Sequence, residues 1–172
     1  MIEIIRYRRA SIEDISQIEE MEELYFPTEA FGRRQIRYLL QSPNAVTLVA
    51  CSDSKVLGYV IGVGRRGSPT VRIYTFCVRE DYRQKGIGTS LLQRLEWECQ
   101  KMGLHHLILE VGDYNLPAIK FYTKNGFVEF SRIPEYYRNG TTAIRMKKTI
   151  TQPLGANDSE LTETTERYKK PR

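Results

Sequence analysis

The sequence predicts a single mixed α/β domain, and three observations lead to this prediction. Apolar residues alternate in some segments and recur at helical spacing in others, in the order β-α-α-β-β-β-α-β-α-β-β. The chain has 172 residues, of which 41% are hydrophobic, enough for one buried core. Apolar residues become scarce after residue 150, so we expect one domain over 1–150 and a mobile polar tail over 151–172.

Boundary signals divide the first half of the chain. Ser11 can cap a first helix, with Asp14 bonding back to it, and Phe26-Pro27 ends that helix because a residue before proline disfavours helical backbone. Asp53-Ser54-Lys55 is typical of a hairpin turn. We therefore expect strands over 2–8, 46–51, 56–63 and 71–78, a second helix over 33–41, and a solvated acidic face on the first helix formed by Glu19, Glu20, Glu22 and Glu23.

The second half contains two predicted helices between strands. The first runs from Thr89 to about Met102 and ends at Gly103, because glycine favours the position just after a helix. The second begins after Asn115, a good capping residue, and continues through Asn125. Strands are expected over 107–111, 128–133 and 142–148.

The composition argues against membrane, secreted and metal-binding proteins. No apolar run is long enough to span a bilayer, and the N-terminus begins with strand-like residues rather than a signal peptide. The cysteines Cys51, Cys77 and Cys99 are odd in number and lie in apolar surroundings, which is typical of reduced core residues. His105 and His106 are adjacent and no CxxC occurs. We expect a cytoplasmic protein with neither a metal nor a membrane partner.

The charge gives a weaker indication. A net charge of +5 and a pI near 9.1 favour anionic ligands in general. Basic and acidic residues are interspersed, and no aromatic and basic RNA-binding pattern occurs, so we expect no nucleic-acid partner. The sequence does not indicate an oligomeric state.

A glycine turn is the most informative segment. After the strand that ends at Val78, a polar loop leads through Gly86-Ile87-Gly88 into a helix. Glycine lets the backbone approach a ligand, and the first N–H groups of a helix are unpaired at the positive end of its dipole. The turn therefore predicts a pyrophosphate site, to which Arg83 and Lys85 add charge.

Several interpretations of this turn compete. A P-loop requires a Lys-Ser/Thr pair after its second glycine, and that pair is missing. A dinucleotide fold requires a third glycine where Leu91 stands, although Glu110 lies near the position of its ribose-binding acid. The third interpretation is the pattern R-x-x-G-x-G over 83–88. A glycine-rich helix start without a ligand remains the fourth.

The pattern over 83–88 resembles the acetyl-CoA motif of the GNAT superfamily of N-acetyltransferases. A second block agrees: Leu109-Glu110-Val111, followed by residues 115–127, resembles the LEV…NxxAIxLYxKxGF stretch of the RimI/Ard1 group of N-terminal acetyltransferases. Tyr136-Tyr137 before the last strand also matches. The resemblance covers nearly all of 1–150 and implies a mostly antiparallel central sheet with a splayed cofactor gap, flanked by about four helices.

The resemblance also implies a role for particular residues. Glu110 matches the general base and Tyr122 the general acid of RimI-like enzymes. Acetyl-CoA would be the co-substrate, its pantetheine arm lying along the strand that ends at Phe76-Cys77-Val78, as an added strand does. Phe26, Pro27, Tyr136 and Tyr137 would form walls of the acceptor groove. The remaining cofactor contacts would come from Arg83, Gln84, Lys85, Gly86, Ile87, Gly88, Thr89 and Asn115.

These residue types suit amide formation. An α-amino group has a pKa of roughly 8, so Glu110 could take its proton, and Tyr122 could protonate the leaving thiolate. The amide of Val78 could stabilise the oxyanion, and Cys77 need not act as a nucleophile. The purely structural roles that compete with these are an ion pair for Glu110, a core aromatic for Tyr122 and a helix cap for Asn115.

The acceptor is less constrained than the donor. The RimI/Ard1 group usually carries an acidic pair before its last strand, and here the residues are Gly140-Thr141-Thr142-Ala143. A protein N-terminus is the leading expectation, with a lysine side chain or a small amine as alternatives. Two further functions are compatible with these residues: a domain that binds acyl-CoA without turnover, and a nucleotide- or nucleic-acid-binding protein that uses the basic glycine turn.

Overall fold

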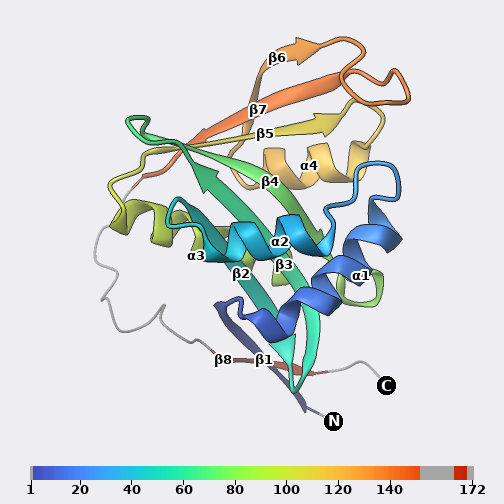
Figure 1. The fold of residues 1–172 in the computed structure, drawn as a ribbon, viewed down its shortest axis with the longest axis vertical. Coiled ribbons are helices and arrows are strands. Elements are labelled where there is room, and N and C mark those ends of the chain that lie inside the picture. Colours follow the sequence, from blue (N-terminus) through green and yellow to red (C-terminus); the bar gives the residue numbers. More distant parts are fainter. Residues whose placement is uncertain (1, 152–164, 170–172) are drawn as a thin grey trace.

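The computed structural model describes residues 2–151 and 165–169, which form an eight-stranded sheet with helices on both faces (Figure 1). The strand order is β6-β7-β5-β4-β3-β2-β1-β8. The strands are β1 (Ile2–Arg9), β2 (Ala45–Ser52), β3 (Lys55–Gly64), β4 (Thr70–Val78), β5 (His106–Gly112), β6 (Val128–Ile133), β7 (Ala143–Thr149) and β8 (Thr165–Lys169). The helices are α1 (Ile15–Tyr25), α2 (Arg33–Gln41), α3 (Ile87–Lys101) and α4 (Leu116–Lys124), with short 3-10 turns at Ile12–Asp14 and Glu80–Tyr82.

The predicted order of elements over 1–150 is confirmed, and every neighbouring strand pair in the described residues is antiparallel except β4 with β5. The tail differs from the prediction in one segment. Thr165–Lys169 forms β8, which pairs with β1 from Ile2 to Arg6. An unpaired edge of β1 offers backbone donors and acceptors to any extended segment that can reach it. Residues 152–164 and 170–172 of the predicted mobile tail lie outside the described residues.

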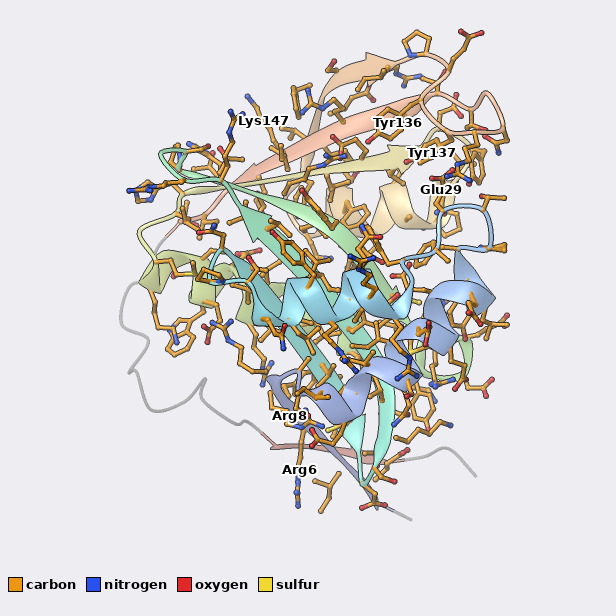
Figure 2. All side chains as sticks on the ribbon, in the orientation of Figure 1. Arg6, Arg8, Glu29, Tyr136, Tyr137 and Lys147 are labelled. Atoms are coloured by element: carbon orange, nitrogen blue, oxygen red, sulfur yellow. The ribbon has the colours of Figure 1, made fainter. Side chains whose placement is uncertain are left out.

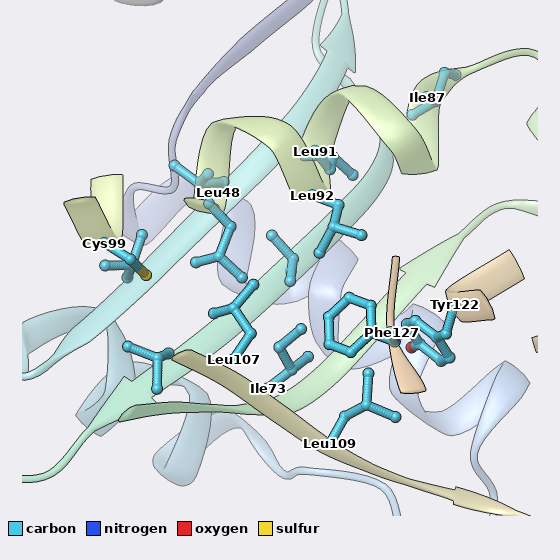
Figure 3. Close-up of a cluster of buried hydrophobic side chains, with 14 of the residues drawn as sticks. Leu48, Ile73, Ile87, Leu91, Leu92, Cys99, Leu107, Leu109, Tyr122 and Phe127 are labelled. Carbon is cyan, nitrogen blue, oxygen red and sulfur yellow. The ribbon is translucent and has the colours of Figure 1, made fainter. Parts of the chain in front are cut away.

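Two apolar clusters hold the layers together. On one face, α1 and α2 bury Ile15, Ile18 and Ile36 against β2 and β3. On the other face, α3 packs over β2, β3 and β4, and residues of α4, β5 and β7 extend the same cluster. Figure 3 shows Leu91 and Leu92 of α3 beside strand residues of this cluster. None of the helices in the described part of the chain is long and apolar enough to cross a membrane.

The parallel pair β4–β5 is short, and this creates the predicted splay. Only Thr70–Arg72 pair with His106–Ile108. Beyond these residues β4 continues along β3 to Val78, while β5 continues along β7 to Gly112. The C-terminal halves of the two strands therefore separate in the middle of the sheet (Figure 1).

A bulge in β4 changes which side chains face the helices. Thr75 lies opposite Ile61 and Ile73 opposite Gly62, so Tyr74 is the extra residue. Before the bulge, Ile73 packs in the cluster under α3 and α4. After it, Cys77 packs under α1 and α2, and Phe76 and Val78 turn toward α3 and α4.

Candidate active site

The edge of β4 is open at the splay. The N–H of Arg79 donates to the carbonyl of Leu57 on β3 at 2.8 Å. Because backbone groups point to alternate sides along a strand, the N–H of Val78 points away from β3 and into the gap. The strand end that the sequence assigned to an extended ligand therefore presents a backbone donor where β5 has diverged.

The glycine turn has the conformation that an anion site requires. Gly86 precedes α3 with a φ of 81°, and Gln84 also has a positive φ of 58°. Among the described residues no side chain caps the start of α3, so the first N–H groups of the helix are left for a ligand. A Cβ on Gly86 would meet nothing within 4 Å, so the space in front of the turn is open.

Gly88 is needed for a different reason: neighbouring aromatic rings leave little room for a side chain at this position. A Cβ there would lie 3.2 Å from the ring of Phe121 and 3.3 Å from the ring of Phe76. These two rings stack 5.5 Å apart and connect β4 with α4 across the splay. The second glycine of the motif thus lets an aromatic pair approach the start of α3.

The cations of the turn are held by the loop itself. Arg83 donates from Nε to the carbonyl of Val78 at 2.9 Å, and its guanidinium lies 5.0 Å from the centre of the Tyr25 ring. Lys85 donates to the carbonyl of Asp81 at 2.7 Å. Both therefore brace the loop in this conformation, and the backbone of the turn is the open part of the predicted pyrophosphate site.

Cys77 faces the α1 and α2 side and is buried. Burial raises the pKa of its thiol to about 12, so almost no thiolate forms near neutral pH. The sequence predicted a core or pantetheine-lining residue that need not act as a nucleophile, and the side chain lies in the core.

Glu110 lies between two arginines. Its neighbours Leu109 and Val111 pack under α3 and α4, so Glu110 points to the opposite face of β5. There Arg72 of β4 donates from Nε to Oε2 at 2.9 Å, and Nε of Arg145 on β7 lies 3.3 Å from Oε1. Only 9% of the Glu110 side chain is exposed. The ion pair expected as the purely structural role is therefore present.

Sequence reasoning missed both arginines. Arg145 lies directly opposite Glu110 in the β5–β7 register, and Arg72 lies beside Ile108. Burial lowers the pKa of Arg72, but the charge of Glu110 and its hydrogen bond outweigh this and raise the net pKa. Each arginine alternates with apolar residues along its strand, which predicts its face, but only the strand order reveals that the two flank Glu110.

Tyr122 lies on the opposite side of the sheet from Glu110. It is buried in an aromatic cluster with Phe76, Phe121 and Phe127, at ring separations of 6.2, 5.4 and 5.5 Å. Figure 3 shows it beside Phe127. Within the described part of the chain its hydroxyl makes no hydrogen bond, and burial raises its pKa. A phenol in this environment keeps its proton.

Asn115 caps α4, as its structural role predicted. Its side-chain oxygen accepts a hydrogen bond from the N–H of Ala118 at 3.3 Å. The residue is half-buried at the end of β5, next to the splay.

The predicted acceptor walls converge at the ends of β5 and β7. Figure 2 shows Glu29 of the α1–α2 loop near Tyr136 and Tyr137. Burial raises the pKa of Tyr137, and the charges of Glu110 and Glu29 contribute in the same direction. The Tyr136 hydroxyl accepts a hydrogen bond from Arg72 at 2.6 Å. An open cavity of about 510 Å³ adjoins this region, lined by Asp113, Tyr114, Asn139, Gly140, Thr141 and Thr142.

Phe26 and Pro27 begin the α1–α2 loop. Phe26 is partly buried against the cluster under α1 and α2, whereas Pro27 is exposed. Further along, Phe31 stacks on Tyr74 at 6.3 Å between ring centres. The bulge residue of β4 therefore supports the far end of the loop.

Glu22 corrects the prediction of a solvated acidic face. It is only 1% exposed and accepts hydrogen bonds from the hydroxyls of Tyr59 and Thr75 at 2.6 and 2.5 Å. A third bond comes from the backbone N–H of Phe31 at 3.0 Å. Its spacing from Ile15 and Ile18 places it on the buried stripe of α1, and this periodicity was the available signal. In the part of the chain that the structure describes, no group of three His, Cys, Asp or Glu residues could hold a metal ion.

The sheet is splayed between β4 and β5, and an open glycine turn leads into α3 beside the splay, as the GNAT resemblance implied. Comparison with known proteins agrees. Residues 13–127 match the acetyltransferase (GNAT) family model. The chain belongs to the GNAT family and is an acyltransferase.

Its relatives lie in the RimI/Ard1 group. The chain is 32% identical over 142 residues to an uncharacterized N-acetyltransferase of Methanocaldococcus jannaschii, covering 82% of this chain and 89% of that protein. It is 28% identical over 148 residues to N-alpha-acetyltransferase 30 of Schizosaccharomyces pombe, covering 84% and 96%. The crystal structure of Ard1 from Thermoplasma volcanium superposes with a TM-score of 0.78 at 26% identity, covering 86% of this chain and 99% of that one.

Proposed function

We propose that this protein transfers an acetyl group from acetyl-CoA to the α-amino group of a protein or peptide. The proposal rests chiefly on the placement of Glu110 and Tyr122 on opposite faces of the sheet beside one gap. An amine arriving from the face of Glu110 and a thiol leaving on the face of Tyr122 would meet where β4 and β5 diverge.

The donor site follows from the backbone. The N–H groups at the start of α3, opened by the left-handed Gly86, would bind the diphosphate. The N–H of Val78 would bond to the pantetheine arm or to the oxyanion of the tetrahedral intermediate. Asn115 would orient the start of α4 at the same gap while capping it.

The amine nitrogen must lose two protons and the leaving sulfur must gain one, and no covalent enzyme intermediate is needed. Glu110 would accept the proton of the incoming ammonium ion, directly or through a water, and the neutral amine would then form the C–N bond at the thioester carbon. The C–S bond breaks as the tetrahedral intermediate collapses. Tyr122, which burial keeps protonated, would donate its proton to the departing thiolate and would then take up the second proton of the nitrogen, so that a neutral amide and a free thiol are released.

A protein N-terminus suits the acceptor side. The Schizosaccharomyces pombe relative is named N-alpha-acetyltransferase 30, and the face of Glu110 is bordered by the α1–α2 loop and by Tyr136-Tyr137. Phe26 and Pro27 would form the base of the loop wall. Two aromatic hydroxyls beside an open cavity give hydrogen-bonding groups for the first peptide bonds of a chain that continues into solvent.

The test compares acceptor classes and then removes the base. Thiol release from acetyl-CoA is measured with peptides bearing a free α-amine, with the same peptides N-terminally blocked but carrying lysine, and with small amines. We expect turnover with free α-amines only. In Glu110→Gln, kcat should fall about 100-fold or more, while the acetyl-CoA dissociation constant stays within about twofold. A large loss of acetyl-CoA binding would contradict the role of Glu110 as base.

A further inference from the structure

Three cationic side chains share the acceptor face of the sheet with Glu110. Arg72, Arg145 and Lys147 come from β4 and β7, on the strand faces that point away from α3 and α4. Helices α1 and α2 lie over β2 and β3 and leave this part of the sheet uncovered (Figure 1), and Lys147 is exposed at its margin (Figure 2). The face where an acceptor would dock therefore carries more positive than negative charge.

This balance poses a problem for a cationic acceptor. The carboxylate of Glu110 is already shared between two guanidinium groups, at 2.9 and 3.3 Å. An ammonium ion that approaches Glu110 therefore meets a net positive cluster, which repels it. An acceptor that carries a carboxylate as well as its amine offsets this repulsion.

Of the two arginines, Arg72 is the one that can be shared with a ligand. Its side chain is 42% exposed, whereas Arg145 is 31% exposed and its Nε is buried. Besides Glu110, Arg72 contacts the Tyr136 hydroxyl at 2.6 Å and lies over the ring of Tyr74 at 5.4 Å. The guanidinium group of Arg72 thus links Glu110, the candidate base, to Tyr136 of the predicted acceptor wall.

We propose that Arg72, assisted by Arg145, is a subsite for a carboxylate on the acceptor, so that the preferred substrates are peptides with Asp or Glu next to the reactive N-terminus. This inference rests on the proposed function. The acceptor carboxylate takes N–H groups of Arg72 in a two-point contact, which a guanidinium provides and an ammonium does not. Glu110 then loses one of its two ionic partners, and the carboxylate oxygen released from Arg72 accepts the proton of the acceptor amine.

The experiment uses pairs of peptides that differ only in Asp or Asn, or in Glu or Gln, at the second position. For the wild-type protein we expect kcat/KM to favour the acidic member by about tenfold or more, the range of one charge-assisted contact. In Arg72→Gln the ratio of kcat/KM between the acidic and the neutral member of each pair should fall to about one. Arg66→Gln, which removes the same charge from the exposed β3–β4 turn, should keep the wild-type ratio.

Two further measurements protect the test against a folding defect. Raising the salt concentration from about 0.05 to 0.5 M should narrow the wild-type preference, because screening weakens the contact of a half-exposed arginine. Arg72→Lys keeps the positive charge but cannot make the two-point contact of a guanidinium, so it should retain only part of the preference for the acidic peptide. Equal kcat/KM for the two members of each pair in the wild type, or a preference unchanged in a folded Arg72→Gln protein, would overturn the subsite. If no peptide is acetylated, the proposed function itself fails.

Discussion

The backbone N–H of Phe31 donates to the buried carboxylate of Glu22 at 3.0 Å, which ties the α1–α2 loop to the underside of its own helix. The other carboxylate oxygen accepts from Tyr59 on β3 and Thr75 on β4. A single side chain therefore fixes the position of the predicted acceptor loop relative to the strand that borders the cofactor gap. Satisfied buried networks of this kind specify one arrangement and are costly to break.

Replacing Glu22 by Gln should loosen that loop. One oxygen becomes an NH₂ group, so at least one of the three donors loses its acceptor, and we expect a loss of about 1–3 kcal/mol in the free energy of unfolding. The KM for acceptor peptides should rise more than the KM for acetyl-CoA. Urea titration and steady-state kinetics check both. Glu20→Gln is the matched control, because Glu20 lies on the same helix with its side chain 60% exposed. A rise confined to the KM for acetyl-CoA would contradict the loop role.

The contrast between Glu22 and Glu110 shows what a sequence can predict here. Periodicity and turn residues identified the helices and strands of 1–150, because each of these elements depends on residues that are close together in the sequence. The resemblance located Glu110 and the glycine turn, because these motifs are local. The partners of both carboxylates come from distant strands: Tyr59 and Thr75 for Glu22, and Arg72 and Arg145 for Glu110. Such pairs follow from strand order and from the bulge at Tyr74, which periodicity does not reveal.

Gly86 offers a test of the donor site. Its φ of 81° costs a branched L-residue about 1–2 kcal/mol, and a side chain there would project into the open space before α3. Gly86→Val should therefore abolish stabilisation by acetyl-CoA in a thermal-shift titration, where ligand binding to the native state raises the melting temperature. Gly67→Val is the control for backbone strain, because Gly67 has a φ of 78° and equally open surroundings but lies on the β3–β4 turn, away from the predicted diphosphate site. It should keep the stabilisation by acetyl-CoA. Retained acetyl-CoA binding by Gly86→Val would refute the placement of the diphosphate.

Cys77 and Cys99 predict a particular response to alkali. Burial raises the pKa of each thiol from 9.0 to about 12, so the folded state holds these protons more tightly than the unfolded state does. The resulting stability is fully present below pH 9 and is lost as the pH rises toward 12. We expect the urea midpoint to fall from about pH 9 upward.

The alanine variants isolate this contribution. In the double variant Cys77→Ala/Cys99→Ala the slope of the urea midpoint against pH should be shallower than in the wild type over the same range, although the variant is less stable at pH 7. Native wild-type protein at pH 8 should also react with a thiol reagent at neither position, since both side chains are buried. Identical slopes in the two proteins would show that other groups control the alkaline transition.

The pairing of β8 with β1 makes the tail a contributor to stability. Truncation after Thr151 removes Thr165–Lys169 and leaves the backbone of Ile2–Arg6 as an exposed edge. We expect the truncated protein to melt at a lower temperature and to self-associate more readily, as light scattering would detect. The candidate site lies on β4, β5 and α3, with β2 and β3 between it and β1, so kcat should be unchanged below the melting range. Truncation after Lys169 keeps β8 and should melt like the full chain. Equal melting of both truncated proteins would mean that β8 adds no stability.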